Sequence, residues 1–142
     1  MSVKSKERIV FDTEAILAFY LGEEGGDVVR DYLKRVQAEE IEGYFNIVNL
    51  TEFYYILYRR DPKIAEEKEK ELRLFGVTIV PIEDDEIWRE AGKIKGKHAL
   101  SLADAFAAAT AKVLGGKLLT GSDEEFEGLD LEVIRIRKKK DS

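Results

Sequence analysis

The chain has 142 residues, of which 44% are hydrophobic and 37% are charged, and its formal net charge is −6. This length is typical of one domain with its own buried core. The absence of cysteine and the presence of one histidine exclude disulfides, thiolate metal sites and histidine-rich zinc sites. We therefore expect a single domain over residues 1–142 that ends in a short basic tail, about residues 137–142.

No apolar run approaches the roughly 18 residues that span a bilayer. The first residues also lack the apolar core of a secretory signal. The sequence therefore predicts a cytoplasmic protein that does not contact a membrane. Its acidic net charge argues against a simple basic nucleic-acid binder, but leaves open a nucleic-acid enzyme whose acids are concentrated at a metal site.

Short apolar, β-branched runs alternate with amphipathic segments along the chain. We expect strands at Arg8–Thr13, Gly43–Val48, Val77–Ile82, Lys117–Thr120 and Glu132–Ile136. We expect helices at Ala15–Leu21, Asp27–Glu40, from Asn49, from Asp61, at Asp84–Lys95 and at Ser101–Leu114. Strands separated by helices predict parallel βαβ units, and thus an α/β fold: a three-layer, Rossmann-like sandwich with a central parallel sheet.

Four acidic residues follow this pattern toward one edge of the predicted sheet. Asp12 ends the first strand, Glu52 lies early in the helix after the second, and Asp123 follows the fourth strand. Asp104 occupies the first turn of the alanine-rich Ser101–Leu114 helix. Because ligands of such folds bind beyond the carboxyl ends of the strands, we expect these carboxylates to meet there.

Helix capping is the competing interpretation of each acid taken alone. Asn49 with Glu52 and Ser101 with Asp104 both have the spacing of a capping box, and Asp12 or Asp123 could cap a helix. Four carboxylates converging on one rim, however, repel one another and take up protons unless a cation is present. Oxygen ligands without Cys or His select Mg²⁺ or Mn²⁺, ions that position and activate water at phosphodiesters.

The ordered set of motifs around these acids resembles the PIN-domain family, in particular its small VapC-type toxin ribonucleases. The residues that carry the resemblance are Val10-Phe11-Asp12-Thr13, Val48-Asn49-Leu50-Thr51-Glu52, Leu100-Ser101-Leu102-Ala103-Asp104-Ala105-Phe106 and Leu119-Thr120-Gly121-Ser122-Asp123-Glu124-Glu125-Phe126. Each motif is weak alone, but the four occur in the family's order and extend over nearly the whole chain.

The resemblance implies a PIN-like fold and a metal-dependent endoribonuclease that acts on RNA. It implies that Asp12, Glu52, Asp104 and Asp123 are catalytic and hold one or two Mg²⁺ or Mn²⁺ ions. It also implies a homodimer and, for a toxin, a small protein antitoxin that blocks the site.

Two positions depart from the family pattern. Glu14 stands where Ser or Asn is more common, which adds negative charge near the site. Gly121 stands two places before Asp123, where a hydroxyl residue is common, and Ser122 lies next to it. Thr13 and Ser122 are therefore supporting candidates, each for a hydrogen bond to a water or a carboxylate.

Two further groups have both a structural and a functional interpretation. Lys93, Lys95, Lys97 and His98 could face substrate phosphates or simply form a solvated loop. Among the aromatic residues Phe53, Tyr54, Tyr55 and Tyr58, we expect two in the core and the rest in a contact with another protein.

Other functions for the same residues stay open. One is a PIN-like protein that binds a metal or partner without turnover, and another is a PIN nuclease of RNA processing or decay. A phosphatase acting on small substrates is a third, although Asp12-Thr13-Glu14 is not the Asp-x-Asp motif of a nucleophilic aspartate.

Overall fold

The computed structural model describes residues 5–121 and 126–137. Its strands are β1 (Arg8–Phe11), β2 (Glu42–Asn46), β3 (Thr78–Val80), β4 (Lys117–Thr120) and β5 (Val133–Arg135). Its helices are α1 (Thr13–Tyr20), α2 (Gly26–Gln37), α3 (Ile47–Arg60), α4 (Pro62–Leu74), α5 (Glu86–Lys97) and α6 (Leu102–Leu114). Every predicted element is present, and the bounds differ by a few residues.

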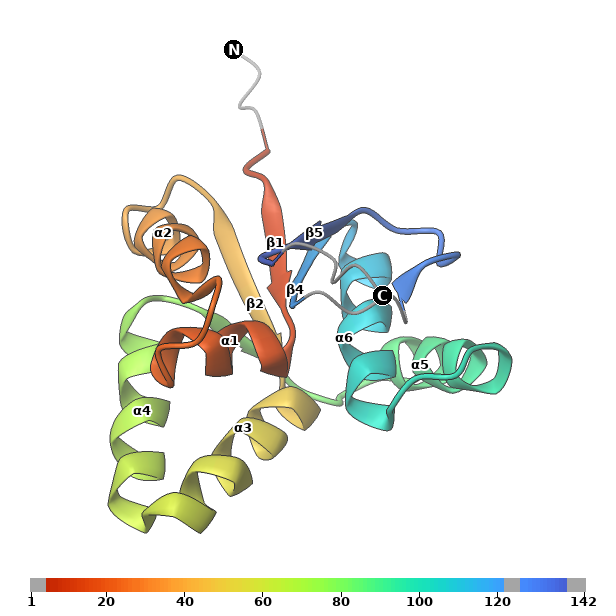
Figure 1. Cartoon of the computed structure of the whole chain (residues 1–142). Helices are drawn as coiled ribbons and strands as arrows, with labels where there is room; N and C mark the ends of the chain where they lie inside the picture. Colours follow the sequence, from red (N-terminus) through yellow and green to blue (C-terminus); the bar gives the residue numbers. More distant parts are fainter. Residues whose placement is uncertain (1–4, 122–125, 138–142) are drawn as a thin grey trace.

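The strands form one parallel sheet in the order β3-β2-β1-β4-β5 (Figure 1). The order places β1 at the centre, with crossovers to both sides. The three-layer α/β fold predicted from the alternation of strands and helices is thus confirmed.

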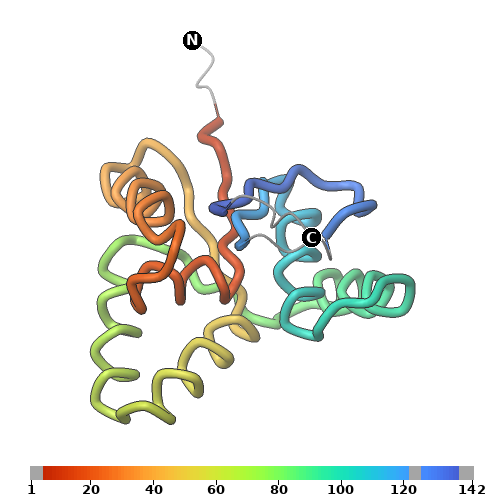
Figure 2. Tube along the Cα trace, in the orientation of Figure 1, coloured from red at the N-terminus to blue at the C-terminus, as the bar shows by residue number. Residues whose placement is uncertain are grey.

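Hydrophobic side chains pack on both faces of this sheet because successive residues of a strand point in opposite directions. In β1, Ile9 and Phe11 belong to the core under α1–α4, and Val10 belongs to the core under α5 and α6. The Cα trace shows the same division, with α1–α4 on one side of the strands and α5 and α6 on the other (Figure 2). Alanines line α6, so this helix packs closely on the sheet.

Two large hydrophobic side chains on α5 and α6 are exposed. Trp88 and Leu102 are 43% and 55% exposed. Trp88 lies in the first turn of α5, where its indole N–H donates to Asp85 at 3.1 Å. Leu102 is the first residue of α6.

The helix after β2 begins at Ile47, two residues before the predicted start at Asn49. Asn46 caps it, because the Asn46 side chain accepts a hydrogen bond of 2.8 Å from the backbone N–H of Val48. The prediction that Asn49 opens this helix is therefore wrong, and Glu52 lies in its second turn rather than its first. No helix within residues 5–121 and 126–137 is long and apolar enough to cross a bilayer.

Candidate carboxylate site at the sheet edge

The site is built around Asp12, which follows the last residue of the central strand. Phe11 pairs with Leu119, so the parallel register places Asp12 beside Thr120 at the ends of β1 and β4. The Thr120 hydroxyl donates to Asp12 Oδ2, and the backbone N–H of Ala15 donates to Oδ1 at 2.7 Å. Asp12 is thus both the N-cap of α1 and a fixed carboxylate at the carboxyl edge of the sheet.

Burial raises the pKa of the Asp12 carboxyl well above its ordinary value, since the side chain is completely buried. The hydrogen bonds from Thr120 and Ala15 lower this pKa in part, because they stabilise the charged form. The negative charges of Glu14 and Asp104 raise it further. Burial and these two neighbouring acids therefore disfavour the charged form of Asp12.

Asp104 comes to this edge from the other side of the sheet, in the first turn of α6. Ser101 caps the helix, and its Oγ accepts a hydrogen bond of 3.1 Å from the backbone N–H of Asp104. Ser101, and not Asp104, is therefore the side chain that caps α6. Its charge acts on Asp12, so the structure brings these two predicted residues together.

Of the two other predicted acids, the structure describes Glu52 alone. Glu52 is half-buried on α3, and Ser122 and Asp123 lie outside the described residues. Within residues 5–121 and 126–137, no three acidic, histidine or cysteine side chains are grouped closely enough to hold a metal ion.

Asn49 lies on α3 with Glu52 and connects this helix to α1, which Asp12 caps, and to α6, which carries Asp104. Its side-chain amide donates to the Thr13 hydroxyl and to the Ala103 carbonyl, each at 3.1 Å. The Thr13 hydroxyl donates in turn to the Asn49 carbonyl at 3.4 Å. Asn49 and Thr13 are buried, so these bonds fix the segments next to the acids without facing substrate. Sequence reasoning assigned Asn49 to a cap and missed this connection.

A second buried amide, that of Asn46, joins β2 to α6 near the same edge of the sheet. Asn46 donates to the hydroxyl of Thr110 at 2.9 Å, and Thr110 donates to the Phe106 carbonyl at 2.7 Å. These two hydrogen bonds join the end of β2 to the middle of α6. The sequence offered a signal for it, since a polar Thr110 interrupts an otherwise alanine-rich helix face.

The two departures from the family pattern, Glu14 and Gly121, lie against each other. A Cβ atom on Gly121 would overlap the Glu14 carboxyl group, and even Oε2 would be only 2.7 Å away. Arg137 holds this carboxylate through Nη1 at 2.5 Å and also donates from Nε to the Glu24 carbonyl at 2.8 Å. Glu14 therefore occupies the space of a side chain at position 121.

The chemistry of the donor set fits a hard divalent cation. The donors are carboxylate oxygens, and Asp12 is a buried carboxylate whose charged form other acids disfavour. Each of its oxygens accepts one hydrogen bond and keeps a second lone pair for a cation. A bound cation would reverse the electrostatic cost of keeping Asp12 ionised.

Comparison with known proteins finds one family and a consistent set of relatives. The family described as "PIN domain" matches residues 9–131. VapC ribonuclease Mb2780c of Mycobacterium bovis and ribonuclease VapC42 of Mycobacterium tuberculosis are each 29% identical over 124 residues, covering 82% of this chain and 92% of the relative.

Several solved structures share the fold. VapBC2 from Rickettsia felis, bound to a promoter DNA fragment, has a TM-score of 0.71 at 13% identity and covers 90% of this chain and 98% of its own. A toxin–antitoxin complex from Klebsiella pneumoniae has a TM-score of 0.70 at 18% identity, and the match covers 92% of this chain and 98% of the other. VapC20 of Mycobacterium tuberculosis, a toxin that cleaves the sarcin-ricin loop, has a TM-score of 0.68 at 18% identity, and the match covers 89% of this chain and 98% of the other.

Proposed function

Since the chain belongs to the PIN-domain family, we propose that it is a ribonuclease that hydrolyses RNA phosphodiester bonds with the help of Mg²⁺ or Mn²⁺. The observation that carries the proposal is the buried carboxylate of Asp12 next to the charge of Asp104 at the carboxyl edge of the sheet. Relatives named as VapC ribonucleases, aligned over most of both chains, support the same activity.

In this proposal Asp12 and Asp104 hold the ion directly, and Glu52 and Asp123 complete the site. When bound, the ion supplies positive charge for the phosphate and the leaving oxygen and activates the attacking water. Thr120 and the Ala15 backbone N–H keep the Asp12 carboxylate in one orientation. Asn49 keeps the segments of Asp12 and Asp104 at a fixed separation through Thr13 and Ala103.

We further propose that the protein is the toxin of a toxin–antitoxin pair, is homodimeric and acts in the cytoplasm. The solved toxin–antitoxin complexes with this fold support a protein partner. On α3, Tyr55 and Tyr58 are 42% and 51% exposed, although aromatic rings of this size stabilise a protein mainly when buried. These exposed rings are our candidate for the contact with a second protein.

Cleavage of RNA tests the proposed activity. Purified protein, free of any antitoxin, is incubated with single-stranded and structured RNA in Mg²⁺, Mn²⁺ or EDTA. We expect cutting only with a metal, and its loss in Asp104→Asn and Glu52→Gln. Glu67→Gln on the exposed face of α4 is the matched control, because it removes one charge far from the site.

The remaining alternatives give different results in the same experiment. A binding protein would take up the metal without cutting RNA. A small-substrate phosphatase would hydrolyse a phosphomonoester and leave RNA intact. A nuclease of RNA processing or decay would cut RNA, but its expression in cells would not stop growth.

A further inference from the structure

A pocket on the far side of α6 from β1 collects lysine side chains in a protein of net negative charge. It lies between α5, α6 and the segment before β5, and has a volume of about 390 Å³. We call it the lysine pocket; its lining residues are Glu90, Lys93, Ile94, Lys97, His98, Lys112, Gly128, Leu129 and Asp130.

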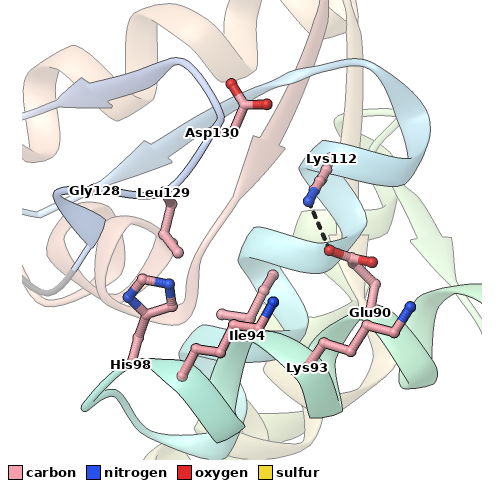
Figure 3. A pocket seen from close by; sticks show the side chains of 9 residues that line it. Glu90, Lys93, Ile94, His98, Lys112, Gly128, Leu129 and Asp130 are labelled. Atoms are coloured by element: carbon pink, nitrogen blue, oxygen red, sulfur yellow. Dashed lines mark hydrogen bonds and ion pairs between the residues drawn. The ribbon is translucent and has the colours of Figure 1, made fainter.

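One face of α5 lines the lysine pocket along its length. Glu90, Lys93, Ile94 and Lys97 have helical spacing, so their side chains lie along the same side of the helix. At a rise of 1.5 Å per residue, the row from Glu90 to Lys97 is about 10 Å long. Ile94 is buried beneath it. Figure 3 shows His98 at one end, beside Leu129, and Lys112 with Glu90 at the other.

The charges of the pocket are only partly neutralised. Lys112 forms an ion pair of 2.8 Å with Glu90 (Figure 3). Within the described parts of the chain, Lys93 and Lys97 have no carboxylate within 4.0 Å. Both side chains are exposed. Both lysines act electrostatically on Glu90, so the pocket sets three lysines against the two acids Glu90 and Asp130 and keeps a net positive charge for an anionic ligand.

The pocket adjoins the segments that carry the acidic motifs. His98 is the C-cap of α5 and precedes Ser101, the N-cap of α6, by three residues. Gly128 and Leu129 follow the fourth motif, which ends at Phe126. Lys112 lies eight residues after Asp104 on α6, about 12 Å along the helix axis. That distance is a few nucleotides of a nucleic-acid strand.

We propose that the lysine pocket binds a backbone phosphate of the RNA strand whose scissile phosphate lies at the carboxylate site. Lysine ammonium groups are point charges suited to phosphate, and such contacts position a strand without reading its sequence. The pocket offsets, at one place, the repulsion between RNA and a chain of charge −6. This inference rests on the proposed ribonuclease function and names a second contact for its substrate.

RNA binding by a non-cleaving protein tests the inference. Full-length Asp104→Asn in Mg²⁺ is titrated into a fluorescent single-stranded RNA, with and without the added pair Lys93→Gln and Lys97→Gln. We expect the pair to weaken binding about tenfold and to reduce the slope of log K against log salt by about 0.7, since the pocket neutralises one phosphate of a single strand.

The matched control is the pair Lys63→Gln and Lys70→Gln on α4, which removes the same charge at exposed positions on the other side of the sheet (Figure 1). We expect this control to change binding by less than about twofold. Circular dichroism checks that both double variants remain folded. Equal weakening by the two pairs would show a general charge effect and overturn the inference.

His98 provides a direct reporter, because it is the only histidine of the chain. In proton NMR spectra of the wild-type protein, inorganic phosphate should shift the imidazole signals of His98, and chloride at equal ionic strength should not. The Lys93→Gln, Lys97→Gln pair should reduce the phosphate effect. No shift with phosphate would contradict a phosphate site in this pocket.

The outcomes separate this inference from the proposed function. If wild-type protein cuts RNA but the pocket pair binds and cuts like the α4 pair, the inference is wrong and the ribonuclease stands. If the pocket pair changes the oligomeric state in analytical ultracentrifugation without changing RNA binding, the pocket is a protein interface. If the protein neither binds nor cuts RNA, both proposals fail.

Discussion

The carboxylate of Glu14 lies in the space that a side chain on Gly121 would fill, and Arg137 holds it there at 2.5 Å. One position gains a long acidic side chain where small polar ones are common, and the other loses its side chain. The two departures are therefore a single structural change. Glu14 reaches over the end of β4 because Gly121 leaves room for it.

This pairing predicts that substitutions at the two positions are coupled. Gly121→Ala should displace Glu14 from Arg137 and destabilise the fold by about 1 kcal/mol. In a Glu14→Ser background the same Gly121→Ala change should cost little, since the carboxylate is gone. Thermal unfolding of the four proteins of this cycle gives the coupling energy. Equal costs of Gly121→Ala in both backgrounds would contradict the pairing.

Because burial raises the pKa of Asp12, we expect the stability of the protein to depend on pH. Burial raises its pKa in the folded state, so the folded protein binds this proton more tightly than the unfolded chain. Its contribution is most favourable below the unfolded pKa and is lost as the pH rises through the folded pKa. In EDTA, the free energy of unfolding of wild type relative to Asp12→Asn should therefore fall as the pH rises through that range.

Addition of Mn²⁺ to the wild-type protein should reverse this loss at neutral pH, because a cation stabilises the ionised carboxylate. Asp12→Asn should gain less stability from the same metal concentration. The comparison is made by thermal unfolding, with KCl of equal ionic strength as the control. An equal gain in both proteins would place the metal elsewhere.

Asn49 predicts a loss of stability together with a loss of activity. Asn49→Ala removes the hydrogen bonds to Thr13 and Ala103 inside the protein, and should cost about 2 kcal/mol. Thr51→Ala on the exposed side of the same helix is its control, with an expected cost below about 0.5 kcal/mol. Chemical denaturation measures both.

A positioning role for Asn49 has a further consequence for catalysis. At a temperature where Asn49→Ala is fully folded, its single-turnover rate should still be reduced, by about 10- to 100-fold, because the segments of Asp12 and Asp104 lose their fixed separation. A wild-type rate in folded Asn49→Ala would reduce this residue to a structural contact.

The fold could be predicted from the sequence because hydrophobic periodicity and local punctuation agree along the chain. Apolar runs such as Ile9–Phe11 alternate with amphipathic helices, which leaves few topologies other than a parallel sheet. The start of α3 was misplaced because Asn46 and Asn49 are both good caps. Their tertiary hydrogen bonds distinguish them, since Asn46 bonds to Thr110 beside its cap bond and Asn49 bonds to Thr13 and Ala103.

The site could be predicted in part. The position of Asp12 follows from the rule that parallel strands end at one edge of the sheet. The proximity of Asp104 to Asp12 depends instead on how α6 packs. The contact of Glu14 with Gly121 and the ties of Asn49 are side-chain contacts between distant segments. No local pattern encodes such contacts, so the sequence named these residues without their roles.

The most direct measurement is single-turnover RNA cleavage by wild type and Asp12→Asn in Mn²⁺, with thermal unfolding of both proteins in parallel. We expect Asp12→Asn to lose more than about 100-fold in rate, while its melting temperature stays the same or rises because the cost of burying a charge is removed. Cleavage by Asp12→Asn at the wild-type rate would contradict the assignment of this carboxylate edge as the active site.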